Sequence, residues 1–180
     1  MREFKFRGKR LKDGKWLYGN LADYRFNFKF TESKKKVIFE NITEFATDNF
    51  GFVVEDCAVD SFTIGPFTGL LDKDGKEIYE SDIIDACFKY ETLDANGCVI
   101  PDNDCLCKGV VRFSKERLQW VLDIFWAESP IARWMKEEED TEIPLVHFEY
   151  ESPEYNMNLL EVIGNVYDNP ELIPNQPTEL

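Results

Sequence analysis

The sequence contains one histidine, no long apolar run and no cysteine pairs at the spacing of a zinc site. A Ser-His or Cys-His catalytic arrangement would have to use His147, and no G-x-S-x-G segment accompanies it. His147 stands beside Phe148 in a strand-like segment, which favours a structural or surface role. No apolar run approaches the roughly 20 residues of a membrane span, and the first residues lack the apolar stretch of an export signal. We therefore expect a cytoplasmic protein that is not an enzyme and has no membrane segment.

Five cysteines are present, and this odd number favours reduced thiols over a disulfide framework. Cys98, Cys105 and Cys107 form a C-x6-C-x-C pattern, and Cys87 lies earlier in the chain. A tetrahedral thiolate site usually uses two C-x2–4-C pairs, which this spacing does not supply. We expect thiols in a loop, with no metal and no cofactor.

Two glycine-containing segments resemble ligand loops only superficially. In Asp-Lys-Asp-Gly at residues 72–75 the glycine is fourth and Ile83 is twelfth, whereas an EF-hand loop needs glycine sixth and glutamate twelfth. Residues 65–69 are followed by no Walker lysine, and Pro66 removes an N–H that a phosphate cradle would use. The sequence therefore predicts turns and loops here rather than binding sites.

Charge is unevenly distributed along the chain. The net charge is −14, but residues 1–36 carry 12 basic and 4 acidic side chains, a net of +8, and residues 37–180 carry a net of −22. Such asymmetry can steer partners or subunits together. Duplex nucleic acid requires a dense basic face, so it is an improbable partner for the acidic body.

Composition and turn signals predict a mainly β fold. Aromatic residues make up 14% of the chain and suit pleated, half-buried surfaces. Lys-Asp-Gly-Lys occurs at residues 12–15 and 73–76, and Asp-Gly between apolar segments is a strong hairpin signal. This echo arises by chance or marks two related β modules. Alternation predicts a strand at 24–30. Further strands are expected at 16–21, 37–39, 50–54, 83–90, 109–113, 145–151 and 159–167, the last interrupted at Gly164.

Other segments have different signatures. Alternating apolar residues predict a return strand at 118–126 after a turn at 114–117, and a helix from Ser114 is the alternative. Glycine and proline predict an ordered loop at 62–70, and polar residues predict a loop excursion near 93–107. Residues 131–140 predict at most one short helix.

Three segments together resemble the YopX-like family of phage and prophage proteins. They are residues 1–18, residues 59–84 (VDSFTIGPFTGLLDKDGKEIYESDII) and residues 160–172 (LEVIGNVYDNPEL). Two positions depart from the family pattern: Ser81 stands where glycine is usual, and Pro66 where glutamine is usual. The resemblance implies a phage- or prophage-encoded, mainly β protein, and it implies no activity.

These observations predict an N-terminal β unit at 1–69, an SH3-like, β-barrel-type unit at 70–170 containing the excursion near 93–107, and an extended tail at 171–180. The similarity of the second unit to small SH3-like barrels is an analogy of fold and implies no function.

The function we expect is that of a non-enzymatic phage accessory protein, a protein-interaction or assembly module. A homo-oligomer is expected, with the basic N-terminal hairpin against the acidic body of a neighbouring copy. The alternative is binding of single-stranded nucleic acid through basic and aromatic side chains. In either case the candidate surface is Lys5, Arg7, Lys9, Arg10 and Trp16. An acidic DNA mimic and an enzyme without a recognisable motif also remain open.

Overall fold

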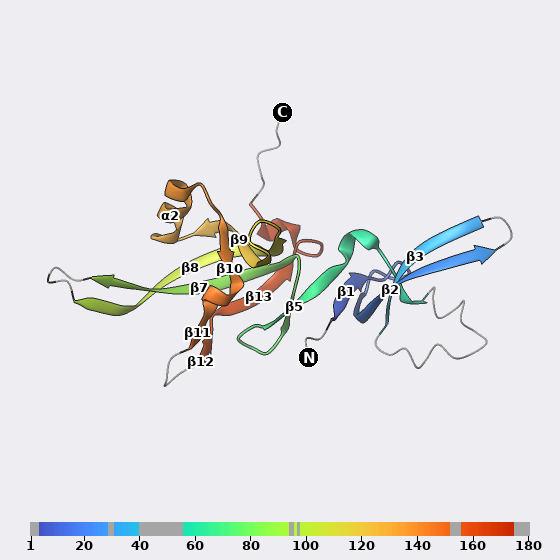
Figure 1. Ribbon diagram of the computed structural model, residues 1–180, viewed down its shortest axis with the longest axis horizontal. Coiled ribbons are helices and arrows are strands. Elements are labelled where there is room, and N and C mark those ends of the chain that lie inside the picture. Colours follow the sequence, from blue (N-terminus) through green and yellow to red (C-terminus); the bar gives the residue numbers. More distant parts are fainter. Residues whose placement is uncertain are drawn as a thin grey trace, which may run out of the picture. The chain divides into compact units, whose positions relative to one another are not determined.

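The computed structural model describes residues 4–28, 31–39, 56–93, 96, 98–151 and 156–174. The chain divides into two compact units, Met1–Gly69 and Leu70–Leu180. Both consist mainly of antiparallel strands (Figure 1), which confirms the mainly β prediction. The strand expected at 50–54 and the end of the tail lie outside the described residues. No helix in the described part of the chain has the length and apolarity needed to cross a bilayer.

The first unit is an antiparallel sheet with the strand order β4-β3-β2-β1-β5. Its strands are β1 (Phe6–Lys9), β2 (Trp16–Phe28), β3 (Thr31–Phe39), β4 (Ala58–Val59) and β5 (Gly65–Leu71), which continues into the second unit. The strands expected at 16–21 and 37–39 are confirmed, and β2 contains most of the strand expected at 24–30. Ile38 and Val59 are at most 3% exposed. Gly8 lies against both, because a Cβ there would be 3.1 Å from the Ile38 side chain.

The first Lys-Asp-Gly-Lys turn joins β1 to β2, as the sequence predicted. The Arg10 N–H donates to the Lys15 carbonyl at 2.8 Å, which closes the hairpin. Gly14 has a φ of +70°, a backbone conformation that glycine adopts without steric cost.

The ordered loop expected at residues 62–70 is wrong, because this segment is the short 3-10 helix η2 (Ser61–Thr63) followed by β5. Gly65, Pro66 and Gly69 predicted the loop, and Pro66 has no N–H to give to a sheet. Pro66 lies opposite Phe6, however, and the next residue, Phe67, donates its N–H to Lys5 at 2.8 Å. Hydrogen-bonded pairs alternate along an antiparallel ladder, so the nitrogen of Pro66 points away from β1. The proline therefore costs the β1–β5 pairing no hydrogen bond.

The second unit contains an open sheet of five antiparallel strands in the order β10-β9-β8-β7-β13. The described residues form no closed barrel, so an SH3-like unit at 70–170 stays a prediction. Its strands are β6 (Glu77–Tyr79), β7 (Asp82–Leu93), β8 (Val99–Ser114), β9 (Gln119–Ala127), β10 (Glu142–Pro144), β11 (Glu149–Glu151), β12 (Asn156–Asn158) and β13 (Leu160–Asn165). Two 3-10 helices, η3 (Leu145–Phe148) and η4 (Pro170–Leu172), complete it. The strands expected at 83–90, 109–113 and 159–167 are confirmed, with a register shift beside Gly164.

The loop excursion expected near residues 93–107 is largely wrong, because β8 already begins at Val99. β7 and β8 pair as a long hairpin that extends beyond the other strands of its sheet (Figure 1). Backbone hydrogen bonds hold such an arm together whatever its side chains are. Asp102, Asn103 and Asp104, which were among the polar residues that predicted a loop, therefore lie on a strand.

The strand expected at 145–151 is also partly wrong, since only its last three residues form β11. Leu145 and Phe148 are both fully buried at the two ends of η3. The three-residue period of a 3-10 helix places these two side chains on one face, towards the core. In a β-strand, residues three positions apart point to opposite faces, so a strand here would have placed Leu145 and Phe148 on different sides.

The return strand expected at 118–126 is confirmed as β9, and the alternative helix from Ser114 is wrong. Leu122 and Ile124 are buried, but Trp126 is 43% exposed. The register shifts at this point, because Lys108 lies opposite Trp126 while the next residue of β8 lies opposite Ile124. This bulge moves the side chain of Trp126 to the other face of the sheet.

One α-helix, α2 (Ile131–Glu138), has defined bounds among the described residues and lies within the predicted 131–140. Ile131 is 4% exposed, and Trp134, one turn later, packs against the same core. Glu139 ends the helix at a φ of +53°, and its N–H donates to the Met135 carbonyl.

The second Lys-Asp-Gly-Lys turn joins β5 to β6 and covers the outer edge of β13. Asp72 N–H donates across the turn to Lys76 at 2.8 Å. The Leu160 carbonyl on β13 accepts from the Lys73 N–H at 2.9 Å. The turn therefore has a packing role in addition to reversing the chain.

Candidate functional site

The candidate basic surface lies on β1, the first turn and the start of β2. The Arg7 guanidinium carbon is 4.8 Å and Lys9 Nζ is 5.6 Å from the centroid of the Trp16 ring. Lys9 pairs with Trp16 across the hairpin, and Arg7 lies two residues away on the same face. Arg7 is only 5% exposed. The structure thus brings these three residues together, but little of Arg7 is accessible to a ligand. Lys5 is half-buried at the start of this hairpin.

Arg10 is turned towards the first turn instead. Its Nε and Nη2 donate to the two carboxylate oxygens of Asp13 at 2.7 and 2.5 Å. This hydrogen bond lowers the pKa of Asp13 to about 2 and raises the pKa of Arg10. Lys12 donates to Asp56 at 2.7 Å, and that hydrogen bond lowers the pKa of the Asp56 carboxyl. The cations of the turn therefore have carboxylate partners within their own unit.

The cysteines singled out by the sequence do not converge. Cys105 and Cys107 are fully buried on β8, whereas Cys98 is exposed. Cys87 lies opposite Leu106, so its side chain is on the other face of the sheet from Cys105 and Cys107. In the part of the chain that the structure describes, no three His, Cys, Asp or Glu side chains are arranged to hold a metal. Cys105 and Cys107 are strand residues, which corrects their expected place in a loop.

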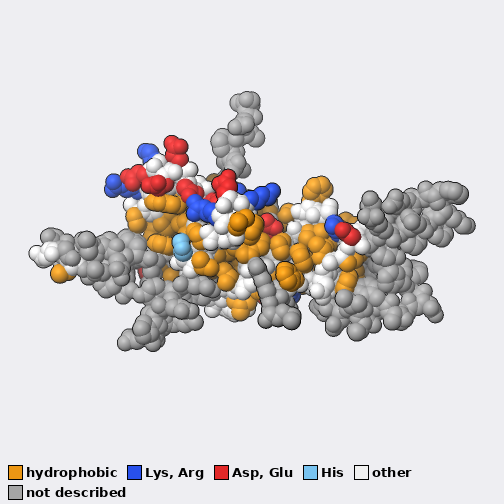
Figure 2. Space-filling model, in the orientation of Figure 1, with side chains coloured by type: hydrophobic (Ala, Val, Ile, Leu, Met, Phe, Trp, Pro, Cys, Tyr) orange, Lys and Arg blue, Asp and Glu red, His pale blue; other side chains and the backbone are white. Residues whose placement is uncertain are grey.

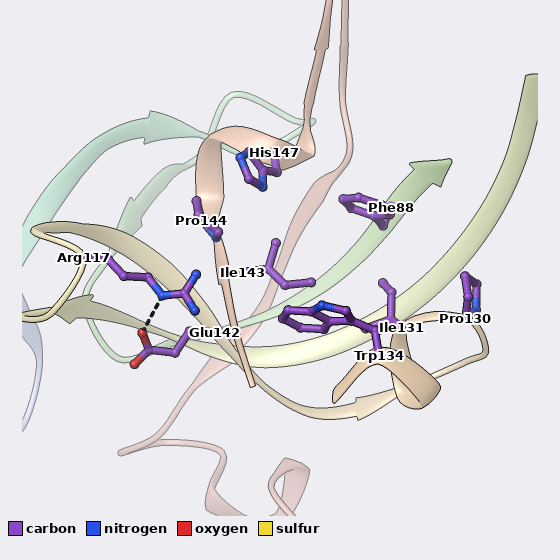
Figure 3. A pocket seen from close by; sticks show the side chains of 9 residues that line it. All are labelled: Phe88, Arg117, Pro130, Ile131, Trp134, Glu142, Ile143, Pro144 and His147. Atoms are coloured by element: carbon purple, nitrogen blue, oxygen red, sulfur yellow. Dashed lines mark ion pairs between the residues drawn. The ribbon is translucent and has the colours of Figure 1, made fainter. Parts of the chain in front are cut away.

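A pocket of about 310 Å³ lies beside β10 in the second unit. Figure 3 shows Ile143 of β10 turned towards Trp134 and Ile131 of α2, with Phe88 of β7 nearby. His147, within η3, lies at the rim and is exposed. The complete lining is Phe88, Arg117, Pro130, Ile131, Trp134, Glu142, Ile143, Pro144 and His147.

The polar side of the pocket is an ion-pair network across three strands. Glu142 on β10 lies opposite Asp123 on β9, and Arg112 of β8 pairs with both, at 2.7 and 3.2 Å. Arg117 pairs with Glu142 at 3.4 Å (Figure 3) and with Asp140. Two arginines therefore hold the Glu142 carboxylate, which leaves it poorly placed to act as a general base.

The outer edge of β10 offers no N–H for another strand to bind. Ile124 donates its N–H to Thr141 at 2.8 Å, so the hydrogen-bonded positions alternate and the backbone of Glu142 and Pro144 points away from β9. The Glu142 N–H donates to the Asp140 carboxylate at 2.9 Å, and Pro144 has none. Strand addition is therefore disfavoured at this edge. A partner here would engage side chains.

Sequence reasoning singled out His147 and the helix at 131–140 but did not find the pocket. Its lining comes from β7, the β8–β9 turn, α2 and the proline before it, β10 and η3, between residues 88 and 147. The available local signal was the spacing of Ile131 and Trp134, which places both on one helix face. That spacing is equally typical of an ordinary core contact.

Comparison with known families gives one match, and it spans nearly the whole chain. Residues 5–174 match the family model of the YopX protein. This range contains two of the three segments that carry the resemblance in full and most of the first. No curated protein matches the chain. The chain therefore belongs to the YopX protein family.

Proposed function

We propose that this chain is a non-enzymatic protein-interaction module, and that the pocket beside β10 receives an apolar side chain of a partner protein. The pocket itself is the observation that supports the proposal, since its walls are mainly apolar and the adjoining sheet edge is closed to strand addition. Its volume of about 310 Å³ is at the lower end of the roughly 300–1,000 Å³ range of ligand pockets. That size suits one bulky side chain better than a large cofactor.

A binding role fits the polar groups of the pocket better than catalysis. Arg117 and Glu142 neutralise each other. Apolar burial supplies binding free energy, about 1.5–3 kcal/mol for a fully buried large aliphatic side chain. The ion pairs at the rim would then set orientation and partner choice rather than affinity.

Membership in the YopX family, together with the resemblance described above, supports a phage or prophage accessory role in the cytoplasm as part of the proposal. Sequencing the genes that flank its coding region tests this, since bacterial housekeeping neighbours on both sides would contradict it. The SH3-like architecture at 70–170 belongs to the proposal as a fold analogy. An experimental structure in which the strands of the second unit stay open would remove it.

The pocket is tested by titrating the full-length protein with N-acetyl-leucinamide and following its amide and indole NMR signals. We expect saturable shifts at residues lining the pocket, with a Kd of about a few millimolar for so small a probe. N-acetyl-glycinamide should produce none. Trp134→Ala should abolish the shifts, whereas Arg133→Ala, on the exposed face of the same helix, should keep them. Equal shifts in both variants would contradict the proposal.

A second candidate function rests on the gathering of Arg7, Lys9 and Trp16 on one face of the β1–β2 hairpin. Single-stranded nucleic acid binds through cations and stacking aromatic rings. The cations already lie over the Trp16 ring, so a stacking base would have to displace them. A gel shift with single-stranded oligonucleotides at low salt, compared with Trp16→Ala, tests this function. No binding by the wild type would remove it.

A further inference from the structure

The first Lys-Asp-Gly-Lys turn presents an exposed leucine among cations. Leu11 is 60% exposed at the end of the β1–β2 hairpin. The side chains of Lys12 and Lys15 beside it are 66% and 76% exposed, and they pair with Asp56 at 2.7 Å and with Asp13 at 3.9 Å. A partner carboxylate would therefore share these two cations with Asp56 and Asp13. The bidentate pair between Arg10 and Asp13 spans the turn at 2.7 and 2.5 Å. Leu11 is therefore held on an ordered turn, and little conformational entropy is lost when it enters a pocket.

The C-terminal end of α2, the helix whose Ile131 and Trp134 line the pocket, carries more acidic than basic side chains and so complements this turn. Glu138 ends α2, Glu139 follows it, and both are exposed. Carboxylates at the C-terminal end of a helix face the negative end of its dipole, so a cation brought there by a partner is favourable. Figure 2 shows charged side chains, many of them acidic, gathered around α2 above the apolar surface that adjoins His147.

The opposite charges of the first turn and the end of α2 follow the distribution of charge along the whole chain. Residues 1–36 carry a net charge of +8, and the remainder carries −22. Oppositely charged surfaces accelerate encounter between two molecules and disfavour wrong orientations. An apolar side chain flanked by lysines is the chemistry that fits an apolar pocket beside an acidic helix end.

We propose that the pocket beside β10 receives Leu11 of a second copy of this chain, with Lys12 and Lys15 against Glu138 and Glu139. The proposal names the partner of the pocket and so rests on the proposed function. The inserted element is a turn, as the closed edge of β10 requires. Pocket and turn are different surfaces, so the contact is heterologous and links copies head to tail. Such contacts close into rings or continue as filaments.

Sedimentation velocity at low salt tests the assembly across a range of protein concentrations. The wild type should show species heavier than the 21.1 kDa chain, increasing with concentration. They should dissociate in about 1 M salt, where the Debye length is about 3 Å. Leu11→Asp should weaken self-association about 10- to 100-fold, the effect of withdrawing one buried leucine. Leu118→Asp changes a leucine in the β8–β9 turn that is 77% exposed, more than Leu11, and should have no effect.

A mixing experiment tests the head-to-tail geometry. Leu11→Asp retains the pocket, and Trp134→Ala retains the turn, so each variant alone should be monomeric. An equimolar mixture should form heterodimers and nothing larger, because only one productive contact is available per pair. The double variant E138K/E139K can replace Trp134→Ala in the same mixing experiment. It reverses two surface charges of the proposed contact and leaves the core against which Trp134 packs unchanged. It should behave as a pocket variant.

Two outcomes overturn the inference: a wild type that stays at 21.1 kDa at every concentration, or a Leu11→Asp variant that assembles as well as the wild type. If N-acetyl-leucinamide still shifts the pocket residues in that case, the proposed function stands and only the partner is wrong. If the probe fails as well, both fall.

Discussion

Asp72 Oδ2 accepts a hydrogen bond from the backbone N–H of Val162 at 3.2 Å, which joins residues 90 positions apart. The other oxygen of the carboxylate accepts from the N–H groups of Asp74 and Lys76, both at 2.9 Å. One carboxylate, on a residue only 6% exposed, thus orders the second Lys-Asp-Gly-Lys turn and fixes it to the outer edge of β13. An uncovered edge at this place would invite pairing with another chain.

Asp72→Ala should lower the free energy of unfolding by about 2–4 kcal/mol, because three N–H groups lose a charged acceptor. Urea denaturation followed by circular dichroism measures the effect. Asp74→Ala changes an exposed carboxylate in the same turn and should alter stability by less than about 0.5 kcal/mol. Equal losses in the two variants would show that Asp72 does not have the role assigned to it.

Ser81→Gly should stabilise the protein. Ser81 has a φ of +70°, and its N–H and carbonyl are both hydrogen-bonded, to Val111 and Val166 at 2.8 and 3.0 Å, so the backbone is held in this conformation. A left-handed residue with a side chain costs roughly 1–2 kcal/mol, and the greater unfolded-state entropy of glycine offsets about half. We expect a net gain of about 0.5–1 kcal/mol by thermal unfolding. Ser61→Gly, at a residue without positive φ, should be neutral or destabilising; a gain there as large would refute the explanation.

Gly109→Ala should destabilise the second unit by about 1–3 kcal/mol, the usual cost of overpacking. A Cβ at Gly109 would lie 2.6 Å from the Asp123 carbonyl oxygen and 2.7 Å from Leu122 Cγ. The backbones of β8 and β9 therefore approach too closely for any side chain. Gly14→Ala is the control variant, because a Cβ at Gly14 would meet nothing within 4 Å. Its loss of stability measures the cost of positive φ alone, without a steric clash. A Gly109→Ala variant with wild-type urea resistance would rule out this close approach.

Cys107 should make stability fall with rising pH in the alkaline range. Burial, and then the neighbouring Cys105, raise the pKa of Cys107 to about 12, whereas an unfolded thiol titrates near 8.5–9. Below about pH 8 both states hold the proton, and the thiol contributes no pH dependence. Above about pH 9 the unfolded state releases it first, which favours unfolding by about 2–3 kcal/mol near pH 10.5.

Comparing the pH profiles of the wild type and Cys107→Ala isolates this proton from the other titrating groups. The wild type should lose more stability than the variant between about pH 9 and 10.5. Parallel profiles would mean that the thiol ionises normally in the folded protein.

The sequence predicted the elements whose signals are local. Asp-Gly turns identified both hairpins because glycine adopts positive φ without steric cost whatever surrounds it. The alternation along residues 118–126 identified β9, and the one short helix predicted within 131–140 is α2. The strand break expected at Gly164 is the register shift beside that residue.

The mispredicted segments depend on partners far away in the chain. Residues 62–70 form a strand because Pro66 lies at a position of the β1 ladder that needs no N–H. Residues 99–107 form a strand because β7 is there to pair with them. Neither segment's own residues reveal the strand with which it pairs. Composition indicates only the local conformational preference, whereas strand pairing depends on residues distant in the sequence.

By itself, the sequence determined the β class, the two turns, the charge asymmetry and the family to which the chain belongs. Only the tertiary structure decided that Arg7 is buried against Trp16, that Asp72 secures the edge of β13, and that residues from five elements form a pocket beside β10. These features arise where segments distant in sequence come into contact. The conformational propensity of each segment depends on its own residues, so it does not specify which distant segments will pack together.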